Sequence, residues 1–124
     1  MKNKCLPLPS PSLVTNLARV LAWGLTMILI VATIVPPSLR PVTGTSHEFE
    51  HLSIFLVTGV TFGLGYQRRG VILCASGILF SAALEISQLL IPGRHARFSD
   101  FLVDAVSACA GIATPLLVSA RVQP

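Results

Sequence analysis

The sequence has little charge and few aromatic residues for its length. Charged side chains make up 11% of the 124 residues and aromatic ones 6%, whereas a typical soluble domain carries about 25% charged residues. Apolar residues account for 52% of the chain, and its mean hydropathy is +0.76. This balance excludes an ordinary soluble enzyme domain. It indicates a membrane protein, and the length leaves room for a single domain.

Cysteine is scarce as well, and several familiar motifs are absent. The three cysteines, Cys5, Cys74 and Cys109, are odd in number and far apart, which excludes a disulfide framework and a cysteine metal site. The chain has no H-E-x-x-H pattern, phosphate-binding loop or nucleophile elbow. Its net charge of +4 is not arranged as a basic patch with interleaved aromatic residues. We therefore expect no metal, no cofactor and no nucleic-acid partner.

What the sequence does contain is a series of apolar segments between sparse charges. The stretch between Arg19 and Arg40 has 20 uncharged residues, about 30 Å of helix, which is enough to cross a membrane. It is longer than the apolar region of a signal peptide, so we expect it to be retained. Spans are predicted at about 17–36, 49–66, 71–91 and 101–119. The expected fold is an all-α polytopic membrane protein, a bundle of four transmembrane helices in a domain over 17–119, with tails at 1–16 and 120–124.

The basic residues predict how this bundle is oriented. With the N-terminus inside, six lysines and arginines fall on the cytoplasmic side and three on the other, so the positive-inside rule favours N-in and C-in in the bacterial cytoplasmic membrane. All five acidic residues, Glu48, Glu50, Glu85, Asp100 and Asp104, then fall in the outer half. Acidic residues contribute little to insertion. Their one-sided distribution instead suggests a site near the outer leaflet.

Helical spacing aligns the polar residues of these segments. Glu85 and Gln88 share one face of the third span with Ser81, and Asp100 and Asp104 share a face of the fourth. A charge inside a membrane span costs roughly 2.5 kcal/mol or more, so such residues are usually paired and often functional. The candidate polar site consists of His51, Glu85, Gln88, Arg94, Asp100 and Asp104, with His47 and Arg97 as weaker candidates.

Each of these residues also has a purely structural interpretation. Glu85 and Gln88 either take part in a function or join helices through hydrogen bonds. Asp100 after Ser99 is a candidate N-cap of the fourth helix, an interpretation that does not extend to Asp104 one turn later. His47 and His51 suit the membrane interface, and a zinc site built from them and an acid is the less favoured alternative.

The order of these residues resembles the VanZ-like family of small bacterial membrane proteins. The resemblance covers about residues 47–117. Its first motif is HEFEHLSIF, with His51 in the histidine position, and its second is E-x-x-Q, which is Glu85 and Gln88 here. The connector then contains P-G-R, which is Pro92, Gly93 and Arg94, and S-D, which is Ser99 and Asp100. A helix with Gly111 follows. The chain departs from the family pattern at His47, Asp104 and Ser107.

The resemblance implies a multi-pass protein of the cell envelope, and the family's named member is associated with low-level resistance to the glycopeptide teicoplanin. We interpret the chain as a protein of open biochemical activity, for which binding is favoured over catalysis, and which binds a lipid-linked or glycopeptide-related anionic ligand near the outer leaflet. Arg94 and Arg97 would then donate to phosphate or carboxylate. The expected partners are membrane lipids and either a lipid-linked envelope precursor or a partner membrane protein.

Three other functions remain open from the sequence. The first is a membrane enzyme acting on a lipid-phosphate, with Glu85 as acid, His51 as base and Arg94 as anion clamp. The second is a structural or assembly subunit whose buried charges fix the helix register. The third is transport or proton relay, which is the least favoured because the acids lie at one depth instead of along a pathway.

Overall fold

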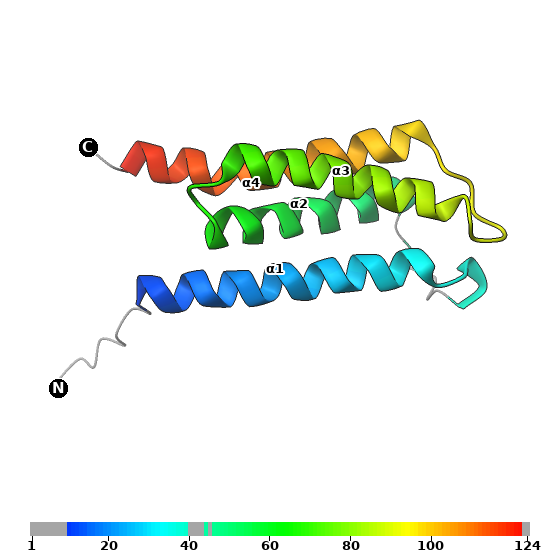
Figure 1. Ribbon diagram of the computed structural model, residues 1–124, viewed down its shortest axis with the longest axis horizontal. Coiled ribbons are helices and arrows are strands. Elements are labelled where there is room, and N and C mark those ends of the chain that lie inside the picture. The colour runs from blue at the N-terminus through cyan, green and yellow to red at the C-terminus, as the bar shows by residue number, and fades with distance from the viewer. Residues whose placement is uncertain (1–9, 40–43, 45, 123–124) are drawn as a thin grey trace.

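The computed structural model describes residues 10–39, 44 and 46–122, and the secondary structure of this part is helical. The helices are α1 (Pro11–Ile34), α2 (His47–Gly65), α3 (Gly70–Gln88) and α4 (Phe98–Val122), with a short 3₁₀ turn, η1 (Pro37–Leu39), after α1. They run up and down (Figure 1), with the start of α1, the end of α4 and the α2–α3 connector at one end and the α3–α4 connector at the other. The expected all-α class is confirmed for the described residues.

Three of the helices are long and apolar enough to cross a membrane, namely α1, α3 and α4. The outward faces of these helices carry large apolar side chains, such as Val20, Leu79 and Val106. Exposed apolar surface of this extent is unfavourable in water and suits contact with lipid. α2 is less apolar because Glu48 and Glu50 occupy its first turn.

α1 begins earlier than the apolar pattern predicts. The helix starts at Pro11 instead of near residue 17, because Ser10 acts as its N-cap and accepts a hydrogen bond from the Leu13 amide at 3.4 Å. Proline in the first helical position has its φ angle preset for the helix and lacks an amide that would remain unpaired there. Hydropathy alone does not predict this start, because residues 11–16 include polar side chains.

α3 ends earlier than predicted, at Gln88 instead of near residue 91. The amides of Leu89, Leu90 and Ile91 bond to carbonyls three residues back, so the last turn tightens into 3₁₀ geometry before the chain leaves the helix. Pro92 disfavours α conformation in the residue before it. Gly93 then takes a φ of 82°, in the left-handed region open to glycine.

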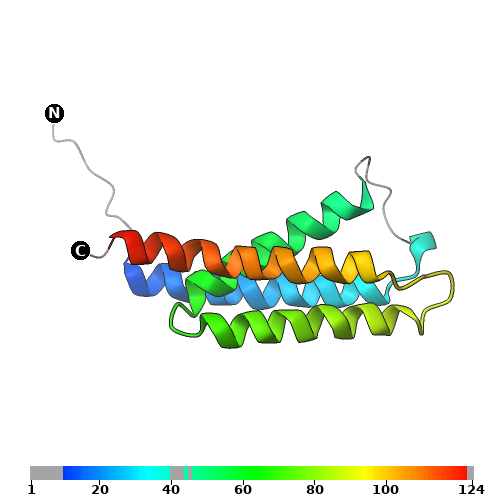
Figure 2. The same ribbon diagram turned by 90° about the horizontal axis from the view of Figure 1, so that it is seen from above.

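α2 lies between α1 on one side and α4 on the other, and α3 packs mainly on α4. Figure 2 shows α2 running obliquely across the other three helices, which are nearly parallel to one another. α1 and α3 contact each other only sparsely. The bundle therefore has a central pair, α2 and α4, with α1 and α3 as flanking helices.

The contact between α2 and α4 depends on glycine. A Cβ at Gly63 would lie 2.6 Å from the Ile112 carbonyl oxygen, and a Cβ at Gly111 would lie 2.9 Å from the Val60 amide nitrogen. Gly59 faces the Ala108 carbonyl in the same way. Small residues allow helix backbones to approach closely in a membrane, where lipid offers no hydrophobic drive for helix association. The G-x-x-x-G of α2 thus packs within the molecule.

We predict that Gly111→Ala destabilises the bundle by about 2 kcal/mol, because the new methyl group must push two helix backbones apart. The matched control is Gly24→Ala in α1, where a Cβ would meet nothing within 4 Å. Thermal unfolding of the purified protein in detergent micelles measures both. Equal melting temperatures for the two variants would contradict the close α2–α4 contact.

Candidate functional site

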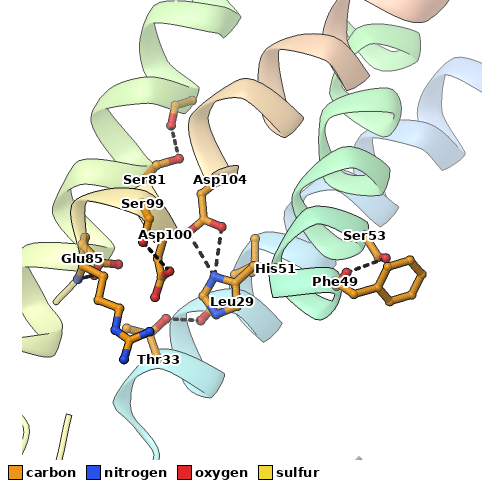
Figure 3. A network of polar contacts seen from close by, with 12 residues as sticks. Leu29, Thr33, Phe49, His51, Ser53, Ser81, Glu85, Ser99, Asp100 and Asp104 are labelled. Atoms are coloured by element: carbon orange, nitrogen blue, oxygen red, sulfur yellow. Dashed lines mark hydrogen bonds and ion pairs between the residues drawn. The ribbon is translucent and has the colours of Figure 1, made fainter. Parts of the chain in front are cut away.

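The candidate residues gather at the end of the bundle opposite the two termini. His51 lies in the second turn of α2. Glu85 and Gln88 lie in the last turn of α3, and Asp100 and Asp104 lie in the first two turns of α4. Arg94 and Arg97 belong to the α3–α4 connector. Figure 3 shows the side chains of His51, Glu85, Asp100 and Asp104 in one region between the helices. The structure thus brings residues from three helices and a connector to one level.

The central contact of this region joins α2 to α4. The Nδ1 atom of His51 lies 2.9 Å from one carboxylate oxygen of Asp104 and 3.2 Å from the other. The Asp104 side chain is 3% exposed and that of His51 is 17% exposed. The His51 ring also stacks on Phe55. A contact of this kind pairs an Nδ1–H donor with a carboxylate acceptor, and it fixes the orientation of the imidazole.

Glu85 holds the start of α4. One of its carboxylate oxygens accepts a hydrogen bond from the backbone amide of Arg97, the residue that precedes α4. The other oxygen is buried without a hydrogen-bond partner among the described residues. The contact ties the last turn of α3 to the returning chain, so Glu85 determines where α4 begins.

Asp100 does not act as the N-cap of α4. The helix begins two residues earlier, at Phe98, and the amides of Asp100 and Phe101 both bond to the Arg97 carbonyl. Asp100 is therefore a buried residue of the first turn, where a negative charge is favoured by the helix dipole. Its carboxylate also accepts from the Ser99 hydroxyl at 3.2 Å. The N-cap interpretation failed because Ser99 and Asp100 look like a helix start in sequence, although the helix has already begun.

Arg94 connects the α3–α4 connector to α1. Its guanidinium donates to the carbonyl of Ala32 at 3.3 Å and to that of Thr33. These carbonyls belong to the last turn of α1, whose four final carbonyls have no partner within the helix and where a positive charge is favoured. The side chain of Arg97 is exposed. The hydrogen bonds described for Arg94 therefore stabilise a helix end.

A cavity of about 240 Å³ lies between the four helices at this level. Its polar lining comes from Thr33, Glu50, His51, Gln88 and Asp104, and its apolar lining includes Leu29, Phe55 and Leu84. We call it the polar cavity. Among the described residues, neither Arg94 nor Arg97 lines it. Its walls thus carry two carboxylates and one histidine.

A second cavity of about 190 Å³ lies deeper in the bundle, and we call it the apolar cavity. Trp23, Phe62, Leu73 and Phe80 are among its lining residues. Leu29 and Phe55 line both cavities, so the two adjoin. Both cavities are lined by residues of all four helices.

Thr33 and Glu50 line the polar cavity but were not among the residues selected from the sequence. Glu50 was noticeable as the acid beside His51. Thr33 is a polar residue in the last turn of α1, and its hydroxyl donates to the Leu29 carbonyl within the helix. No spacing rule connects α1 to a site on the other three helices, so only the fold could bring Thr33 to the cavity.

His47 is the first residue of α2, but its side chain lies outside the described residues. Within the described part of the chain, no three histidine, cysteine or acidic side chains come together as a metal-binding group. Cys74 and Cys109 are free thiols in neighbouring helices, and the Cys109 sulfur lies 3.9 Å from the Cys74 carbonyl oxygen.

Comparison with known proteins identifies a family. A family model described as VanZ/LLP1 matches residues 11–119, which includes α1 as well as the region from 47 to 117 that carries the sequence motifs. No curated protein and no solved structure gives a significant match.

We predict that His51→Ala and Asp104→Ala each destabilise the bundle, and that the double variant is less destabilised than the sum of the two. Removing one partner leaves the other buried and unpaired, and coupling of neighbouring polar groups amounts to about 0.5–3 kcal/mol. Thermal unfolding of the three variants in micelles measures the coupling. Glu48→Ala, at an exposed position in the first turn of α2, is the control. Strictly additive effects would exclude a pairing that contributes to stability.

Proposed function

The chain belongs to the VanZ/LLP1 family, and on this basis we propose that it is a multi-pass protein of the bacterial cytoplasmic membrane that binds a single-chain amphiphile within its helix bundle. The observation that carries this proposal is the polar cavity, lined by His51 and Asp104, that adjoins the apolar cavity. The head of the ligand would occupy the polar cavity, and its hydrocarbon chain would occupy the apolar cavity.

The proposed topology has all four helices crossing the membrane, with both termini in the cytoplasm. α2 has 19 residues, about 28 Å of helix, close to the thickness of the hydrocarbon core. Its position between α1 and α4 supports a span despite the two acids in its first turn, because these acids lie at the helix end near the membrane surface. The end with both termini also carries Arg19, Arg68 and Arg69, in keeping with the positive-inside rule.

The lining of the polar cavity favours a ligand head that donates hydrogen bonds. The carboxyl groups of Glu50 and Asp104 are among its polar lining groups, and a carboxylate only accepts hydrogen bonds. A phosphate or carboxylate head would meet these acceptors at low dielectric, which is unfavourable. A hydroxyl or an ammonium group would instead find acceptors. The proposal therefore departs from the anionic ligand inferred from the sequence, for which Arg94 and Arg97 were to supply the positive charge.

The apolar cavity suits one hydrocarbon chain. An engineered apolar cavity of about 150 Å³ accepts benzene, so a cavity of about 190 Å³ accommodates somewhat more carbon. Since α1 and α3 contact each other only sparsely, a chain can reach this space from the surrounding lipid. A ligand entering this way would need no aqueous route.

Catalysis is the second candidate, and the geometry of His51 is what supports it. A histidine whose Nδ1 is held by a carboxylate presents Nε2 as a general base, as in hydrolytic triads. Among the described residues that line the polar cavity, the only hydroxyl is that of Thr33, which donates to its own helix. We therefore propose binding in preference to a reaction through a side-chain hydroxyl.

Ligand binding is tested with three amphiphiles of one alkyl chain length, bearing an amine, a hydroxyl or a phosphate head. We expect the amine and the alcohol to raise the melting temperature of the purified protein, and the phosphate to raise it less. Native mass spectrometry in an uncharged detergent gives the stoichiometry. Equal or tighter binding of the alkyl phosphate would contradict the proposed head-group preference.

The matched variants for this test fill space without removing polar groups. Ala32→Leu places a larger side chain in the polar cavity, which Ala32 lines, and is expected to abolish the shift. Ala83→Leu adds the same volume on an exposed face of α3 and is expected to retain it. Binding that persists in Ala32→Leu would exclude the polar cavity as the head-group site.

Topology is tested separately with dual-reporter fusions after Gln67 and after Ala96. We expect cytoplasmic reporter activity at the first and periplasmic activity at the second, because these positions lie in connectors at opposite ends of the bundle. The same readout at both positions would contradict the four-span arrangement.

A further inference from the structure

The opposite end of the bundle, near the two termini, has a third cavity that the proposed function does not use. It has a volume of about 270 Å³, and its lining includes Thr15, Arg19, Tyr66, Gln67, Arg68 and Arg69. We call it the arginine pocket. It lies between α1, the end of α2 and the α2–α3 connector. We propose that the arginine pocket binds the phosphate headgroup of an anionic membrane lipid.

Arg19 is held in position at this pocket by two contacts. Its Nε donates to the carbonyl of Gly65 at 2.8 Å, and its guanidinium carbon lies 4.9 Å from the centre of the Tyr66 ring. The first contact satisfies a carbonyl at the end of α2, and the second is a cation–π interaction. A guanidinium fixed through its Nε and its face still has its terminal N–H groups, which suit bidentate binding of phosphate.

Arg68 and Arg69 add two more positive charges from the connector, and both side chains are exposed. α3 starts directly after them at Gly70, and no side chain caps this start. The first amides of α3 therefore add partial positive charge at the edge of the pocket. No acid opposes these charges locally, because all five acidic residues of the chain belong to the turns and helix ends at the other end of the bundle.

The surroundings of the pocket indicate a lipid instead of a free anion. The indole of Trp23 donates to the Tyr66 hydroxyl at 3.1 Å, next to Arg19. Tryptophan and tyrosine prefer the level of the lipid headgroups, where one part of the ring is dry and the other wet. Basic pockets between helices at this level bind anionic headgroups. Leu64, which also lines the pocket, adds apolar surface for the chains of such a lipid.

The test uses the full chain in an uncharged detergent, titrated with phosphatidylglycerol and with phosphatidylcholine of the same acyl chains. We expect tighter binding of phosphatidylglycerol, and a Kd that rises at least about tenfold in the Arg68→Gln/Arg69→Gln double variant. Native mass spectrometry measures the bound lipid. Arg19 is left unchanged because its replacement would also disturb the α1–α2 contact.

The control variant is Arg97→Gln/Arg121→Gln, which removes two exposed arginines that do not line the pocket. It is expected to bind phosphatidylglycerol as the unmodified chain does. An unchanged Kd in the Arg68/Arg69 variant, or an equal loss in the control, would overturn the proposal. Equal stabilisation by inorganic phosphate would assign the pocket to a soluble anion and would overturn it as well. None of these results depends on ligand binding in the polar cavity.

Discussion

The close approach of α2 and α4 is the constraint on which the rest of the structure depends. Gly59, Gly63 and Gly111 let the two backbones touch, and this contact is the most extensive in the bundle. It sets the register in which His51 meets Asp104. It also leaves α1 and α3 on the flanks of a central pair, where they contact each other only sparsely. The two adjoining cavities are therefore a consequence of helix packing, and a small change at a glycine would alter their shape.

Polar groups in this bundle are concentrated at its two ends, as the membrane requires. Where they enter the helices, most have partners: His51 with Asp104, and Glu85 with the Arg97 amide. Arg94 satisfies the final carbonyls of α1. Unpaired polar groups in hydrocarbon cost several kcal/mol each, so these contacts are needed for the fold whatever ligand is bound. A structural role and a binding role are compatible for His51 and Asp104, since the pair also lines the polar cavity.

The helical class, the positions of the helices and the clustering of polar residues at one end all followed from the sequence, because hydropathy and helical spacing are local properties. Asp104 was selected as a residue that capping does not explain, and it is the buried partner of His51. Partners across helices could not be deduced in this way. Thr33 has no sequence relation to His51, and the helix ends at Pro11 and Gln88 depend on capping and turn geometry instead of on hydrophobicity.

The arginines illustrate why charge alone is a poor guide to a ligand. Two arginines beside several acids in one connector suggest an anion clamp, yet a helix end nearby also needs donors, and Arg94 supplies them to α1. The ionisable residues that line the polar cavity are Glu50, His51 and Asp104. The arginines that line a cavity lie at the opposite end of the bundle, and they are Arg19, Arg68 and Arg69. The two ends of the bundle thus differ in the groups that line their cavities, with carboxyl groups and an imidazole at one end and guanidinium groups at the other.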